Sequence, residues 1–134
     1  MKTVVINYNA ADSWGGTPAA VPTHITGKFL QIAHNNTEYL IFSPKEITAY
    51  HADILERFCR ERDIKGSYDM ERKCYEVDDP SLTVEGGGKF EIDTVVRSIR
   101  IYDDSMAYGK FNPSGLREKV LALKELAGYN VTIE

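Results

Sequence analysis

The sequence predicts one domain of the α/β or α+β class, with a mixed sheet of about six strands flanked by two main helices. Its 134 residues suit a single domain spanning residues 1–134, and no internal repeat divides them. Several short stretches alternate apolar with polar residues, as half-buried strands do. Two longer stretches instead repeat apolar residues at helical spacing. Together these observations favour a sheet covered by helices.

Six stretches have the pattern of strands, and a seventh at residues 74–77 is weaker. They are residues 3–8, 28–34, 38–42, 82–92, 99–102 and 129–134. The second and third are joined by Asn35-Asn36-Thr37, a connection of hairpin length. Gly86-Gly87-Gly88 interrupts the fourth, so we expect the backbone to bulge there or to pass close to another group.

The first helix is predicted to begin at Ser43-Pro44-Lys45-Glu46, which has a capping serine, a proline at the first helical position and a glutamate three residues after the cap. Apolar residues then recur at helical spacing as far as Phe58. The second helix is predicted over residues 114–127, with Gly128 where a left-handed stop belongs. Residues 9–27 and 63–82 have neither periodicity, and they predict a long loop and an inserted or flexible excursion.

Composition narrows the classes of partner. The chain has 20 acidic and 16 basic side chains, and this net charge of -4 argues against sequence-independent binding to nucleic-acid phosphates. No run of eighteen apolar residues predicts a membrane span, and residues 1–8 lack the apolar core of a signal peptide. Cys59 and Cys74 do not form a CxxC pattern, so we expect reduced thiols. The prediction is a cytoplasmic monomer.

The stretch between the strand at Ile99 and the helix-start residues Asn112-Pro113-Ser114 is the first candidate site. A loop that leaves a strand and enters a helix has unpaired backbone amides, and these can bind an anion. Ser105, Met106 and Ala107 lie in this loop and are mostly small enough to let a phosphate oxygen approach. An ordinary strand-to-helix connection has the same pattern, and spacing alone favours it.

Two other motifs do not support the chemistry that they suggest. Gly86-Gly87-Gly88-Lys89 is followed by Phe90 rather than serine or threonine, so it does not match a nucleotide-binding P-loop. Asp103 and Asp104 point to opposite faces if they extend the strand, and no third ligand accompanies them at helpful spacing. We therefore predict no metal and no cofactor.

His51 lies on the margin of the apolar stripe of the first predicted helix. Asp53 is two residues away, and on a helix that spacing places the two side chains on different faces. A histidine at such a margin is ordinarily a boundary residue of the core. On periodicity alone, a structural role for His51 is the better interpretation.

Three blocks in order nevertheless resemble the phosphohistidine phosphatase family, also called Janus/Ocnus. They are Tyr50-His51-Ala52-Asp53-Ile54, Gly86-Gly87-Gly88-Lys89, and Tyr102 with Ser105-Met106-Ala107-Tyr108-Gly109. The resemblance runs from Lys28 to the C-terminus and does not cover the first 27 residues. It implies a sheet of about six strands with two helices, and hydrolysis of phosphohistidine, sometimes phospholysine, in proteins or peptides without a metal.

The resemblance also implies roles for individual residues. The family's catalytic histidine falls on His51, and its phosphate-contacting lysine falls on Lys28. Its phosphate-binding backbone falls on Ser105, Met106 and Ala107, and the basic residue after the glycines, usually arginine, is Lys89 here. A neutral imidazole can accept a proton from water near neutral pH, so His51 is the candidate general base.

Two departures bear on the expected activity. Asp103-Asp104 stands where the family commonly has Gly-Tyr, which places negative charge near the expected phosphate. Lysine at position 89 keeps the charge of arginine but cannot bind a phosphate through two parallel hydrogen bonds. Two further functions therefore stay open: a phospholigand-binding module without turnover, and a structural domain whose loop binds nothing.

Overall fold

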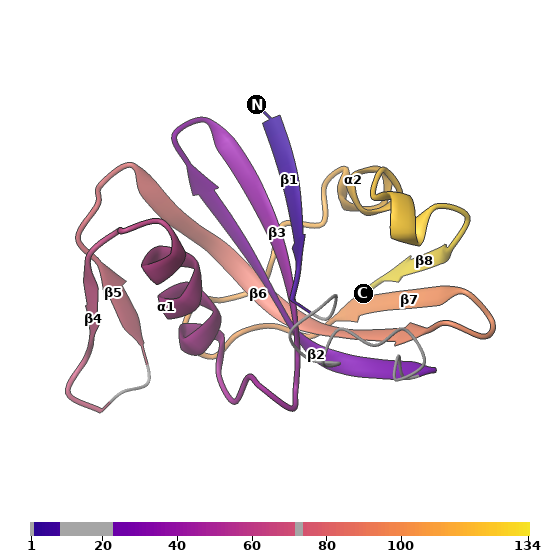
Figure 1. Ribbon diagram of the computed structural model, residues 1–134, viewed down its shortest axis with the longest axis horizontal. Coiled ribbons are helices and arrows are strands. Elements are labelled where there is room, and N and C mark those ends of the chain that lie inside the picture. The colour runs from indigo at the N-terminus through magenta and orange to yellow at the C-terminus, as the bar shows by residue number, and fades with distance from the viewer. Residues whose placement is uncertain (1, 9–22, 72–73) are drawn as a thin grey trace.

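The computed structural model describes residues 2–8, 23–71 and 74–134, and it confirms the predicted fold class. Six strands form one strongly curled mixed sheet in the order β1-β3-β2-β6-β7-β8 (Figure 1). They are β1 (Lys2–Asn7), β2 (His24–His34), β3 (Thr37–Pro44), β6 (Leu82–Asp93), β7 (Ser98–Tyr102) and β8 (Asn130–Ile133). The outermost pairs, β1 with β3 and β7 with β8, are parallel, and the inner pairs are antiparallel.

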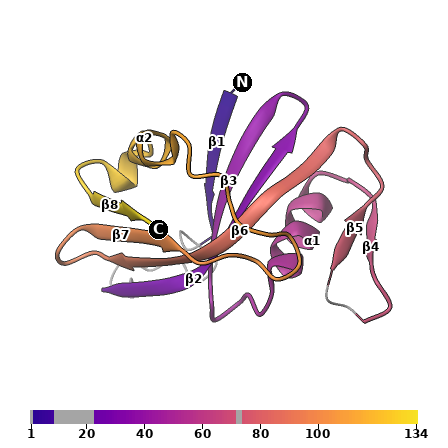
Figure 2. The same ribbon diagram turned by 180° about the vertical axis from the view of Figure 1, so that it is seen from behind.

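Two helices cover opposite faces of this sheet, with a core under each (Figures 1 and 2). Helix α1 (His51–Glu61) packs on Leu30 and Ile32 of β2, whereas α2 (Leu116–Leu121) packs on the face that carries Phe29. Successive strand residues point to opposite faces, so neighbours in β2 enter different cores. Phe29 is completely buried, and its ring contacts those of Phe42 and Phe111.

The predicted start of the first helix is wrong by seven residues, because Tyr50 and not Ser43 holds the cap position. Ser43 and Pro44 continue β3, where they pair with Lys28 and Gly27, and α1 begins at His51. The Ser43 hydroxyl contacts that of Thr48 instead of capping a helix. The pairing of a buried strand has overridden the local capping pattern, because Ser43 is only 2% exposed. At the true start, the carboxylate of Asp53 accepts the Tyr50 N–H at 3.0 Å.

The second helix is shorter than predicted. Gly115, with a φ of 67°, precedes α2, and the helix ends at Leu121. A separate turn of 3₁₀-helix, η3 (Lys124–Leu126), follows after an extended residue at Leu123. This break turns the chain so that Leu126 reaches the core with 4% exposure. Gly128 has a φ of 82°, as its predicted role as a left-handed stop requires.

The two segments predicted without regular structure are partly ordered. Residues 9–22 of the predicted loop lie outside the described residues, but β2 begins at His24, because Ile25 is buried in the same core as Phe29 and pairs with Ile92. Within residues 63–82, β4 (Gly66–Tyr68) and β5 (Tyr75–Val77) form an antiparallel pair beside α1 (Figure 1). The buried Tyr75 anchors this pair in the core under α1. The described part of this segment therefore contains a strand pair, and β5 confirms the weaker strand predicted at residues 74–77.

The predicted irregularity at the three glycines is confirmed. The register between β2 and β6 shifts by one residue after Gln31, which is the signature of a bulge. The glycines also allow close approach: a Cβ on Gly86 would lie 2.2 Å from the Lys110 carbonyl oxygen, and one on Gly88 would lie 2.5 Å from that of Tyr102. Side chains at these positions would force the neighbouring backbone away from β6.

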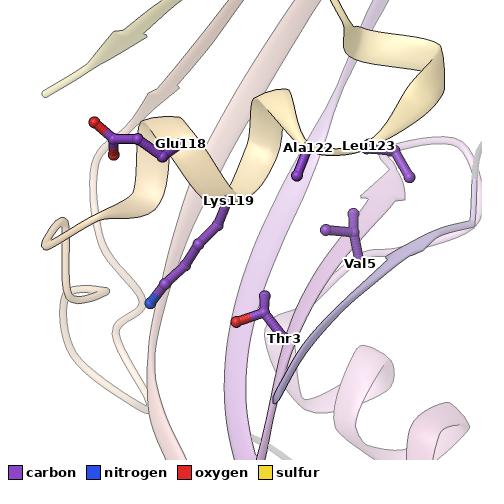
Figure 3. Close-up of a pocket in the computed structure, with 6 residues that line it drawn as sticks. All are labelled: Thr3, Val5, Glu118, Lys119, Ala122 and Leu123. Carbon is purple, nitrogen blue, oxygen red and sulfur yellow. The ribbon is translucent and has the colours of Figure 1, made fainter. Parts of the chain in front are cut away.

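A polar cluster fixes α2 to the other end of the sheet. The Lys119 ammonium lies 2.7 Å from the carboxylate of Glu38, which is 5% exposed and also accepts from Gln31 at 3.2 Å. Figure 3 shows Lys119 of α2 and Thr3 of β1, which both line a groove of about 430 Å³. The groove contains none of the predicted site residues.

Candidate functional site around His51

His51 is the first residue of α1, and its ring lies against the glycine segment of β6. The residue is 7% exposed, and its Nε2 lies 2.8 Å from the carbonyl oxygen of Gly88. A carbonyl oxygen only accepts hydrogen bonds, so Nε2 carries the proton in the neutral ring. Nδ1 is then the nitrogen with the free lone pair, which is the form that a general base needs.

Gly87 allows the ring to take this position. A Cβ on Gly87 would lie 2.7 Å from Cδ2 of His51 and 2.8 Å from the carbonyl oxygen of Phe29. Both distances are shorter than real Cβ contacts. The second glycine of the motif therefore has a specific function in the structure, which is to make room for the histidine.

Burial lowers the pKa of His51 below its ordinary value of 6.5, and the hydrogen bond to Gly88 opposes this shift. The charge of Lys28 lowers this pKa further, whereas Asp103 and Asp104 raise it. These charges act on His51 because the fold brings them near it. Lys28 lies on the same face of β2 as Leu30, which packs against α1. Histidine is therefore neutral here at physiological pH.

We predict that NMR titration of His51 gives a midpoint below 6.5. Lys28→Met should raise the midpoint because a repelling cation is removed, and Asp103→Asn should lower it because an attracting anion is removed. The unfolded chain binds the proton more readily than the folded one, so stability should also fall as the pH drops below 6.5. A midpoint at or above 6.5, or one that neither variant moves, would show that these groups do not surround His51.

Lys28 and Lys89 are direct neighbours across β2 and β6, but their ammonium groups differ in their contacts. Lys89 Nζ lies 3.1 Å from the carboxylate of Asp103, and this ion pair raises the pKa of Lys89. The Lys28 ammonium has no hydrogen bond or ion pair to any of the described residues. Lys28 is consequently the better placed of the two to receive an anion.

Asp103 adopts a φ of 67°, a left-handed conformation that aspartate tolerates better than most residues. The resemblance places this residue where glycine is common. The Nζ of Lys110 supports the conformation by donating to the Asp103 carbonyl oxygen at 3.0 Å. The two carboxylates predicted near the site, Asp103 and Asp104, are present, and Asp103 forms the ion pair with Lys89.

Only some of the backbone amides in the predicted phosphate-binding loop are free of hydrogen bonds to other described residues. The Ser105 N–H donates to the Gly109 carbonyl at 3.1 Å, and the Gly109 N–H donates back at 2.8 Å. The amides of Met106 and Ala107 have no acceptor among the described residues. The prediction that all three amides are available is therefore wrong for Ser105, because the loop closes on itself as a tight turn.

The sequence had suggested that the free amides lie at a helix N-terminus, but in the structure they do not. After Gly109 the chain returns to β6, where Gly87 donates to the Gly109 carbonyl at 3.0 Å and accepts from the Phe111 N–H at 3.3 Å. Helix α2 begins only at Leu116. Gly87 thus joins the base of the loop to the strand against which the His51 ring lies.

Tyr108 is a site residue whose role the sequence analysis missed. Its hydroxyl accepts the Tyr75 N–H at 2.9 Å and donates to the Tyr75 carbonyl at 3.0 Å, while its own N–H donates to Ser105 Oγ at 3.1 Å. Tyr108 therefore holds the loop against β5. Its place in the motif with Ser105 gave one signal, and the weaker strand predicted at residues 74–77 is the partner β5, but no local pattern indicated that the two would meet.

The described residues contain no group of three or more histidine, cysteine, aspartate or glutamate side chains that could hold a metal ion. Nor does any helix among them have the length and apolar character needed to cross a membrane. Cys59 is buried and Cys74 half-buried, and both are free thiols. The chemical groups that the site does offer are an imidazole base, a free ammonium and two backbone amides.

The curled sheet with a histidine packed on its glycine strand defines an α+β domain with a candidate anion site. Residues 23–126 match the model of the Janus/Ocnus family (Ocnus). Because this match covers well over half of the sequence, the chain belongs to the Janus/Ocnus family. The resemblance is thereby confirmed for the family. Comparison with curated proteins returned no match.

Proposed function

We propose that the protein is a metal-independent phosphohistidine phosphatase that hydrolyses the P–N bond of phosphohistidine, and also of phospholysine, in proteins or peptides. The observation that carries this proposal is the hydrogen bond from His51 Nε2 to the Gly88 carbonyl at 2.8 Å. It orients a buried ring and leaves Nδ1 as the basic nitrogen. The free thiols fit the proposed cytoplasmic location, and the proposal includes a monomeric state.

In this mechanism His51 takes a proton from the water that attacks phosphorus. The lowered pKa keeps the ring unprotonated at neutral pH, so the base is ready without prior loss of a proton. The bond between water oxygen and phosphorus forms as the bond between phosphorus and the substrate nitrogen breaks. The leaving nitrogen takes up a proton from solvent, and His51 returns to solvent the proton that it took from water. For Nδ1 to act as the base, the attacking water needs only to lie within hydrogen-bond distance of it.

The phosphoryl group needs donors directed at its oxygens, because the transition state is loose and its charge spreads over the equatorial oxygens. Lys28 and the amides of Met106 and Ala107 are the groups that support this role, since none of them has a competing partner within the described residues. Lys89 and the Ser105 amide would first have to leave their present partners.

That last point favours a second candidate function, a phospholigand-binding module without turnover. Two of the predicted phosphate contacts are already occupied, Lys89 by Asp103 at 3.1 Å and the Ser105 amide by Gly109 at 3.1 Å. A site with fewer free donors can retain binding and lose stabilisation of the transition state.

Phosphate release from phosphohistidine, phospholysine and phosphotyrosine, measured side by side, separates these functions. The proposed phosphatase releases phosphate from the first two substrates and not from the third. A binding module releases none, but phosphate raises its melting temperature. If there is neither release nor a shift in melting temperature, both functions are wrong.

We predict that Lys28→Ala raises KM for a phosphohistidine peptide about tenfold and lowers kcat much less. A lysine that contacts the phosphoryl group in both the ground state and the transition state contributes mostly uniform binding. Lys65→Ala, which removes an exposed lysine after α1, is the matched control and should change neither constant. An unchanged KM in Lys28→Ala would remove this lysine from the site.

A further inference from the structure

A hollow of about 530 Å³ lies beside the His51 site. It is formed by the start of β2, the loop that follows β3 and the end of β6. The lining residues that matter here are Lys28, Lys45, Thr48, Lys89, Glu91 and Tyr102. Neither His51 nor the loop at Ser105 lines it. Lys28 links the two regions, because it lines the hollow and its charge acts on His51.

The charges that line the hollow are not balanced. Glu91 accepts from the Tyr102 hydroxyl at 3.1 Å and lies 3.9 Å from Arg100, so cations outside the hollow offset it. Lys89 is neutralised by Asp103. Lys28 and Lys45 have no ion-pair partner among the described residues. The hollow therefore has two uncompensated cations.

Backbone hydrogen bonds hold Lys45 at the edge of the hollow. Its backbone N–H donates to the Thr26 carbonyl at 3.0 Å, and its carbonyl accepts from Thr48, whose hydroxyl contacts that of Ser43. These contacts fix the loop after β3 against the first residues of β2. The side chain of Lys45 starts from a defined position at the edge of the hollow.

The size of the hollow exceeds what one phosphoryl group requires. A volume of about 530 Å³ lies in the range of pockets that hold a ligand of several groups. In the proposed function Lys28 faces the phosphoryl group, which leaves Lys45 without a role. A second anionic group of the substrate would meet this cation.

We propose that this hollow is a subsite for an acidic side chain of the substrate protein, placed next to the phosphohistidine in sequence and recognised by Lys45. The inference rests on the proposed function, because it takes the phosphoryl group to lie between His51 and Lys28. It assigns to Lys45 a role in choosing the substrate and none in the chemical step.

The test uses three peptides that carry the same stable phosphonate analogue of phosphohistidine and differ only in the flanking residues, which are glutamate, glutamine or lysine on both sides. Calorimetry at low salt measures their Kd for the wild type, Lys45→Ala, Lys45→Glu and the control Lys65→Ala. The wild type and the control should bind the glutamate peptide about three- to fivefold more tightly than the glutamine peptide. Salt should reduce that preference.

The variants decide whether Lys45 is responsible. Lys45→Ala should abolish the preference, and Lys45→Glu should reverse it in favour of the lysine peptide. Equal affinity of the wild type for all three peptides would overturn the proposal, as would a preference for glutamate that survives in Lys45→Ala. Hydrolysis of free phosphohistidine by the same preparations tests the proposed function separately, because that substrate has no flanking residue.

Discussion

His51→Ala is expected to lower kcat/KM for a phosphohistidine peptide by about two to four orders of magnitude, the usual contribution of a general base. The variant should also be less stable, because loss of the ring leaves the buried Gly88 carbonyl without its donor at 2.8 Å. Steady-state kinetics together with thermal unfolding separate the two effects.

His51→Gln refines this test, because a glutamine amide can still donate to Gly88 but cannot act as a base. We expect His51→Gln to recover much of the lost stability and none of the lost activity. His34→Ala is the matched control: His34 is the last residue of β2 and lies 3.1 Å from Asp79, and its removal should leave kcat/KM unchanged. Substantial activity in His51→Gln would show that the ring has only a structural function.

Gly87→Ala is expected to lower activity about a hundredfold, the effect of misplacing a catalytic group by about 1 Å. The new Cβ would lie 2.7 Å from the His51 ring and 2.8 Å from the Phe29 carbonyl, so the ring or the strand must move. Overpacking of this kind should also lower the free energy of unfolding by about 1–3 kcal/mol. Kinetics and denaturant unfolding of the same preparation measure both effects.

Gly128→Ala is the control for the glycine substitution. Gly128 has a φ of 82°, and a Cβ added there would have no described atom within 4 Å, so alanine strains the backbone without touching the site. It should cost about 1–2 kcal/mol of stability and leave kcat/KM unchanged. If Gly87→Ala behaves like Gly128→Ala, then Gly87 does not position His51.

The strands of the six-stranded sheet were predictable in outline because their signals are local. The hairpin of β2 and β3 follows from two apolar-rich runs joined by a short connection, in which Asn35 and Asn36 take φ values of 50° and 62° that asparagine tolerates. The bulge follows from the glycines. In both cases the residues whose pattern predicts the turn or the bulge are the residues that form it, so the prediction did not depend on knowing a distant partner.

The start of α1 was not predictable from the same kind of signal. Ser43-Pro44-Lys45-Glu46 has the residues of a helix start, but pairing of Ser43 and Pro44 with β2 outweighs a cap. Capping contributes about 1 kcal/mol, less than the burial of a central strand. The actual first turn has Tyr50 in the capping position, a residue without capping preference, so no pattern marked it.

In the site, the family motifs placed His51 and Lys28 near one another, as the structure does. Other contacts hold the loop in place or occupy one of the predicted phosphate contacts. These contacts join residues far apart in the sequence, and no local pattern predicts them. Tyr108 and Tyr75 are 33 residues apart, and Asp103 meets Lys89 only because β6 and β7 are paired. Nothing in the sequence indicated that Lys45 lies near the site, because the capping pattern placed it in the first turn of a predicted helix.

A rapid-quench single turnover with labelled phosphohistidine peptide, in excess chelator, tests whether His51 acts as a base on water without a metal. A nucleophilic His51 would form another phosphohistidine, close in energy to the substrate, whereas a base forms no phosphoenzyme. We expect the label to pass from peptide to free phosphate, with none trapped on the protein. Label on His51 during turnover, or no release until a metal is restored, would contradict it.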